Sequence, residues 1–194
     1  MENKELVQRF IEVFDSVIPI IEDVKKGFFT QNHSILEEGR SKFEEAVKSR
    51  VPYAEKIIEE KDKDETAKKY VDLFITIQSV ALAVENLINK MKTKVELKIL
   101  FSEKALSEIR ELYDVFQTQL RDTRDYILTR NPHLKEKIMA AKERLIELAR
   151  EYDLVHQQRL ITGICMPKAS YLYIDMTDSL KRIARGLADF AEKA

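Results

Sequence analysis

Apolar residues recur at steps of four and three along the last long stretch of the chain, residues 171–192. Their stripe consists of Leu172, Met176, Leu180, Ile183, Leu187 and Phe190. This spacing places them on one side of an α-helix and leaves charged residues beside them. Five further stretches carry similar stripes, and none outside the turns alternates strictly between apolar and polar residues as a strand would. The sequence therefore predicts an all-α protein of six long helices.

Few residues interrupt these stripes, because the chain has only four glycines and four prolines. Pro19 lies where the first stripe continues in phase, so we expect it to kink that helix instead of ending it. Pro52 either kinks or breaks the second helix, and both outcomes stay open. Asn131 and Pro132 are expected to open the fifth helix as N-cap and first helical residue. The first five helices are expected over residues 4–28, 32–58, 64–91, 100–129 and from 132 to a turn at 163–167. The stripe of the fifth helix is expected to end with Tyr152, Val155 and Arg159.

The first three predicted helices resemble the last three at a spacing of about one hundred residues. The matching apolar positions in the first and fourth helices are 10, 13, 14, 17, 21 and 28, followed by 109, 112, 113, 116, 120 and 127. Two tandem three-helix bundles are therefore expected, over residues 1–95 and 96–194.

Composition narrows the classes of partner. The 33 basic residues nearly balance the 34 acidic ones, which argues against a nucleic-acid binder. Cys165 is the single cysteine, so an intrachain disulfide and a cysteine zinc cluster are excluded, and a small apolar role in a loop is expected. The N-terminus lacks a signal-peptide pattern, and the apolar run at residues 73–84 is shorter than a membrane span. We expect a cytoplasmic protein that reaches a membrane only through a partner.

The C-terminal third resembles the PhoU family. The similar segments are His156–Leu160 and Pro167–Ala191. Within the second segment, the resemblance is carried by Leu172–Asp175 followed by Leu180–Ala184. The resemblance implies a flat body of two three-helix bundles. It also implies a cytosolic regulator of phosphate uptake, and PhoU-type domains further form the soluble tail of sodium/phosphate cotransporters.

The resemblance also implies a metal motif that this chain does not keep. The family helix typically reads Leu-Glu-Arg-Ile-Gly-Asp, and its two carboxylates hold metal. Here those two places hold Lys181 and Arg185, and in the first repeat they hold Ala81 and Glu85. Two carboxylates one turn apart can share a cation, whereas two cations repel each other. We therefore expect the usual metal clusters and any cofactor to be absent, with Glu85, Asp175 and Asp178 as weaker candidates for a substitute site.

The cluster of Lys181, Arg182 and Arg185 has two interpretations. It is either a helix face that pairs with Asp178, Asp189 and neighbouring helices, or a basic patch that docks an acidic partner surface or an anion such as phosphate. Solvent exposure and the absence of intramolecular carboxylate partners would favour the patch.

Other polar residues favour a structural role. Asp153 and His156 have the spacing of ferritin-like metal helices, but no second copy exists, so a surface pair on the fifth helix is expected. A solvated charged face is expected from Asp114, Asp122 and Asp125 with Arg121 and Arg124. His33 and His133 stand at helix starts and are expected to be solvated.

No nucleophile elbow, glycine-rich phosphate loop or dinucleotide fingerprint occurs, so an enzyme is not expected. The leading hypothesis is a non-enzymatic regulator that docks against a phosphate transporter or a phosphate-sensing protein. The alternatives are a ferritin-like metal-carboxylate protein and a self-associating structural bundle. A homodimer is expected in any case.

Overall fold

Six α-helices make up almost all of the described part of the computed structural model, which covers residues 3–49, 65–163 and 166–194. They are α1 (Asn3–Phe29), α2 (His33–Lys48), α4 (Glu65–Glu96), α5 (Glu103–Thr129), α6 (Pro132–Ile161) and α7 (Pro167–Lys193). These residues include no strand, so the predicted all-α class is confirmed. Pro52 and Cys165 lie outside the described residues.

The helix ends follow local sequence signals. α1 passes through Pro19 without ending, and the chain then turns at Gln31, whose φ is 56°. At the start of α6 the Asn131 side chain accepts the His133 N–H at 3.0 Å and Pro132 is the first helical residue, as expected. Three boundaries differ from expectation: α2 ends at Lys48, where a helix to residue 58 was expected, α4 continues to Glu96, and α7 begins one turn earlier, at Pro167.

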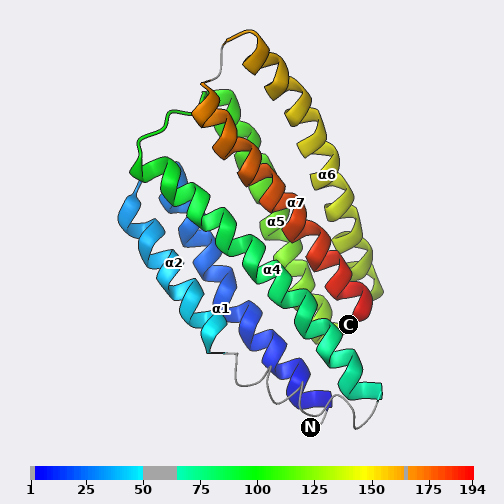
Figure 1. Ribbon diagram of the computed structural model, residues 1–194. Coiled ribbons are helices and arrows are strands. Elements are labelled where there is room, and N and C mark those ends of the chain that lie inside the picture. The colour runs from blue at the N-terminus through cyan, green and yellow to red at the C-terminus, as the bar shows by residue number, and fades with distance from the viewer. Residues whose placement is uncertain (1–2, 50–64, 164–165) are drawn as a thin grey trace.

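The helices lie side by side in a bundle, in which α1, α2 and α4 occupy one side and α5, α6 and α7 the other (Figure 1). Contacts between the two sides are made chiefly by α4 with α7 and by α1 with α5. One apolar core cluster draws buried residues from all six helices, including Leu36 of α2 and Leu145 of α6. The division into repeats at residues 1–95 and 96–194 stays a prediction, because the core is continuous across it.

Ion pairs link α1 to α5 along their exposed edge. Lys25 pairs with Asp114, Arg121 pairs with Glu22, and Arg124 Nε lies 2.8 Å from Asp15 Oδ1. The pairs run in opposite sequence directions, so the two helices are antiparallel. Asp114 and Arg121 are exposed, as expected of a solvated charged face, whereas the pairing of this face with α1 was not predicted.

The stretch Tyr70–Glu96 of α4 is long and apolar enough, by length and composition, to cross a membrane. This differs from the expectation that its apolar run is too short. In the fold, 39% of its most apolar 18-residue window is buried, and the helix packs against α7, α2 and α1. Core helices of soluble proteins have the same composition, so the finding is weak evidence for a membrane span.

Candidate functional site

The apolar stripe of α7 decides where its cationic side chains point. Leu180, Ile183 and Leu187 are fully buried against the core. The residues between them must therefore face α6, α4 or solvent. Lys181 is half-buried on the α6 side, whereas Arg182 and Arg185 are exposed.

Lys181 is paired within the fold. Its Nζ lies 2.6 Å from Asp178 Oδ1 and 3.2 Å from Asp153 Oδ2. Burial opposes the charge on this ammonium, but the two carboxylates outweigh it and raise the pKa of Lys181 above its usual value. This residue fits the interpretation of a helix face that pairs with its neighbours.

Arg182 and Arg185 differ from Lys181, since neither forms an ion pair with a carboxylate of the described residues. Both line a surface hollow of about 410 Å³ between α4 and α7, which we call the α4–α7 hollow. Its other lining residues are Ser79, Leu82, Ala83, Asn86, Ser179, Gly186 and Asp189. The three cations singled out in the sequence therefore separate into one paired lysine and two accessible guanidinium groups.

The three candidate metal ligands do not converge. Asp175 turns toward α4, where its Oδ2 lies 2.6 Å from Lys90 Nζ, while Asp178 pairs with Lys181. Glu85 faces α2, where it adds to the effect of Glu37 and Glu44 in raising the pKa of Arg40. Within the described part of the chain, no three His, Cys, Asp or Glu side chains come together as a metal site would require. The arrangement gives no support to the ferritin-like alternative.

His156 is not on the surface, so the expected surface pair with Asp153 is wrong. The imidazole is 3% exposed and stacks on the Tyr173 ring, with 4.4 Å between ring centroids. Neither of its nitrogens has a hydrogen-bond partner among the described residues. The buried face of α6 runs through His156, and Val155, which was expected in the stripe, is exposed. Burial, followed by the nearby Arg159 charge, lowers the pKa of His156.

A buried carboxylate lies beside this histidine. Glu108 of α5 is 1% exposed, and its Oε2 accepts from Arg159 Nη2 at 2.8 Å and from the Tyr173 hydroxyl at 2.7 Å. We call Glu108, His156, Arg159 and Tyr173 the buried polar cluster. The sequence did not predict this cluster, although Arg159 stands in the predicted apolar stripe of α6. An arginine in such a stripe is itself a signal that a buried carboxylate faces it.

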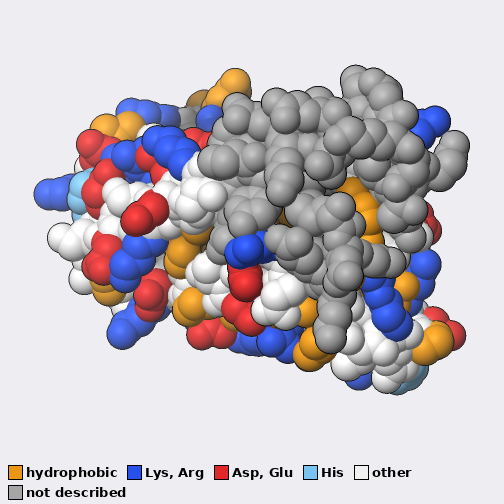
Figure 2. All heavy atoms as spheres, turned by 90° about the horizontal axis from the view of Figure 1, so that it is seen from below, with side chains coloured by type: hydrophobic (Ala, Val, Ile, Leu, Met, Phe, Trp, Pro, Cys, Tyr) orange, Lys and Arg blue, Asp and Glu red, His pale blue; other side chains and the backbone are white. Residues whose placement is uncertain are grey.

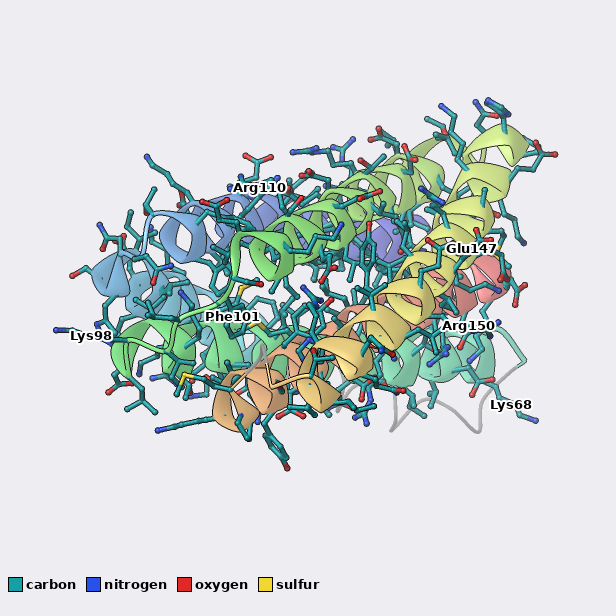
Figure 3. All side chains as sticks on the ribbon, turned by 90° about the horizontal axis from the view of Figure 1, so that it is seen from above. Lys68, Lys98, Phe101, Arg110, Glu147 and Arg150 are labelled. Atoms are coloured by element: carbon teal, nitrogen blue, oxygen red, sulfur yellow. The ribbon has the colours of Figure 1, made fainter. Side chains whose placement is uncertain are left out.

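A second buried cation lies at the same end of the bundle. Lys94 of α4 is 2% exposed, and its Nζ donates to Gln31 Oε1 at 2.8 Å. The rings of Phe28 and Phe101 lie near the ammonium, and Phe101 also packs edge-on against Tyr173. Figure 3 labels Phe101 in the connection before α5. Burial lowers the pKa of Lys94. These contacts join α1, α4, the α4–α5 connection and α7, and we assign them a structural role.

Charge is mixed on the one face of the bundle that Figure 2 draws. His33 and His133 are exposed. On the face drawn in Figure 2, Lys and Arg side chains lie among Asp and Glu side chains. Such mixing agrees with the balanced net charge and does not resemble the basic surface of a nucleic-acid binder.

No family model and no curated protein matches the sequence. Among solved structures, the chain is similar to the crystal structure of the phosphate transport system regulatory protein PhoU from Streptococcus pneumoniae. The TM-score is 0.70 and the identity 13%, and the match covers 98% of this chain and 91% of that one. The chain therefore has a PhoU-like fold, which confirms the fold implied by the resemblance in the C-terminal third.

Proposed function

We propose that this chain is a non-enzymatic, cytoplasmic regulator of phosphate transport or phosphate signalling that docks against a membrane transporter or sensor. The PhoU-like fold over nearly the whole chain supports this proposal, since the similar structure is that of a phosphate transport regulatory protein. Loss of the family's metal motif is part of the proposal, because Lys181 and Arg185 stand where its carboxylates would be.

The α4–α7 hollow is the proposed docking site. We choose this hollow because Arg182 and Arg185 are exposed and neither pairs with a carboxylate of the described residues. Guanidinium groups that are already solvated and unpaired can engage a partner's carboxylates without breaking an internal ion pair. The partner surface is therefore expected to be acidic.

Affinity capture tests this proposal. The protein would be used as bait on detergent-solubilised membranes of its source organism, at high and low phosphate. Recovery of a phosphate transporter or phosphate-sensing kinase is expected, and Arg182→Gln should weaken it. Lys104→Gln is the charge-matched control, because Lys104 is exposed on α5 away from the hollow. Recovery of the bait alone would reject docking, and equal recovery by both variants would reject the α4–α7 hollow.

Self-association is a second candidate property, favoured by an exposed apolar group at one end of the bundle. Leu97 and Leu100 in the α4–α5 connection and Met166 and Tyr171 at the start of α7 are all more than half exposed. Such a group commonly marks an interface between copies. We propose a homodimer through this end.

Light scattering should give the mass of a dimer, and Leu100→Ser with Tyr171→Ser should give a monomer, whereas the control Ile75→Ser should not. A monomeric parent protein would reject the proposal.

A further inference from the structure

A second hollow lies between α6 and α7, on the other side of the cationic face of α7. It has a volume of about 250 Å³ and is lined by Ile146, Arg150, Asp153, Leu154, Gln157, Lys181 and Arg185. We call it the α6–α7 hollow. Arg185 lines both hollows, whereas Arg150 lines only this one and Arg182 only the α4–α7 hollow.

Positively charged side chains line the α6–α7 hollow on both of its walls. Arg150 comes from α6, and Lys181 and Arg185 come from α7. Figure 3 shows Arg150 on α6 beside the later turns of α7. The lining includes a single carboxylate, Asp153, and Lys181 already engages it at 3.2 Å. The lining therefore holds an excess of positive charge that the hollow itself does not neutralise.

The two arginines carry this excess. Both Arg150 and Arg185 are exposed, and neither forms an ion pair within the residues that the structure describes. A guanidinium group offers several N–H donors in a planar fork that matches the oxygens of a phosphoryl group. The Gln157 side chain adds an amide donor to the lining.

We propose that the α6–α7 hollow binds a small oxyanion of the phosphate or pyrophosphate class between Arg150 and Arg185. The volume suits one or two phosphoryl groups and is too small for a folded partner. A nucleic-acid strand would need a longer basic track than these two helices present. The two proposals share Arg185, but this one can be tested separately from the docking role, because Arg150 lies outside the α4–α7 hollow.

Calorimetric titration of the full chain with pyrophosphate, and separately with inorganic phosphate, tests the site without divalent cations at moderate salt. Saturable binding of one pyrophosphate per chain is expected. Arg150→Gln should weaken it by roughly tenfold, since a charge-assisted hydrogen bond contributes about that much to an equilibrium constant. Arg182→Gln should change it less than twofold, because that side chain lies in the other hollow. Circular dichroism would verify that both variants stay folded.

Two results would overturn the site. One is the absence of saturable binding of either anion to the parent protein. The other is equal weakening by Arg150→Gln and Arg182→Gln, which would show that only the general charge of the surface attracts the anion. Neither result would bear on docking, whose test depends on Arg182 and on recovery of a membrane partner.

Discussion

Glu108 and Arg159 form the most buried ion pair described in this protein, and their side chains are 1% and 12% exposed. Removing two charges from water costs several kcal/mol, which is recovered only when geometry and further hydrogen bonds are good. Here the Tyr173 hydroxyl supplies one further bond to the same carboxylate oxygen. The pair therefore holds α5, α6 and α7 in one arrangement and leaves each partner costly to remove.

Replacing Glu108 with Gln should lower the free energy of unfolding by about 3 kcal/mol, because Arg159 then loses the buried carboxylate that faces it. This is the low end for breaking a buried pair, since Arg159 keeps some contact with solvent. Urea unfolding measures the change. The control is Glu151→Gln, an exposed carboxylate on α6 that should change stability by less than about 0.5 kcal/mol. Equal effects of the two variants would show that the buried pair contributes little.

His156 should make the protein sensitive to mild acid. Its pKa is lowered by burial, then by Arg159, while Glu108 and Asp153 oppose the shift. Below the ordinary value of 6.5 the unfolded chain takes up a proton that the folded chain resists, so stability falls as the pH drops. The loss attributable to this group is at most about 1.4 kcal/mol per pH unit.

The test is His156→Phe, which keeps a ring against Tyr173 but cannot bind a proton. Urea unfolding at pH 7.5 and 5.5 should show a smaller loss of stability in this variant than in the parent, by about 1 kcal/mol. His133→Phe changes an exposed histidine and should behave as the parent does. If His156→Phe loses as much stability as the parent between these pH values, protonation of His156 is not the cause.

The sequence predicted the wrong surroundings for His156 because a helical stripe is wide. His156 and Val155 are neighbours near the edge of the α6 stripe, and apolarity favours Val155 as the buried one. The fold buries His156 instead, since the ring of Tyr173 offers it a stacking surface. Such a choice depends on which side chain α7 presents across the interface, and periodicity within α6 carries no information about that.

At the scale of elements, the crossing of α4 over α7 depends on one glycine. A Cβ built at Gly186 would lie 2.4 Å from Val80 Cγ2, well inside van der Waals contact. Valine is stiff at χ1 in a helix, so its methyl group cannot turn away without strain. The two helices can therefore approach this closely only while position 186 carries no side chain.

Gly186→Val should destabilise the protein by about 2 kcal/mol, because overpacking forces the two helices apart. Val80→Ala in the same chain removes the clashing methyl group and should restore more than half of that loss. A double-mutant cycle with Val80→Ala alone, measured by thermal or urea unfolding, isolates the coupling between the two positions. Additive effects would mean that Gly186 and Val80 do not restrict each other.

The sequence predicted the individual helices better than it predicted which helices lie against each other. Helix periodicity and the Asn131–Pro132 start are local properties, and the structure confirms that start. The pairing of α1 with α5 was missed, since it joins Lys25, Glu22 and Asp15 to residues about one hundred positions away. Each surface ion pair of this kind contributes little to stability. The charged residues that form such pairs therefore look no different in the sequence from charged residues that face only water.

At the scale of the whole molecule, the question is whether the two repeats unfold together. The core cluster continues from one to the other, and the buried Tyr113 hydroxyl of α5 donates to the Ile21 carbonyl of α1 at 2.9 Å. Phe190 of α7 also packs against Phe10 and Phe14 of α1. Separating the repeats would expose these apolar surfaces to water and break the Tyr113–Ile21 hydrogen bond, so we expect a single cooperative transition.

The tyrosines allow a direct test, because the chain has no tryptophan and five of its seven tyrosines lie after residue 95, namely Tyr113, Tyr126, Tyr152, Tyr171 and Tyr173. Leu36 is fully buried in α2, which packs against α1 and α4. Leu36→Ala should cost about 2 to 5 kcal/mol. With cooperative repeats, it must shift the near-ultraviolet tyrosine transition in urea as far as the far-ultraviolet helix transition. A tyrosine transition that stays at the parent midpoint would show that the repeats are separate folding units, as the repeat in the sequence alone would suggest.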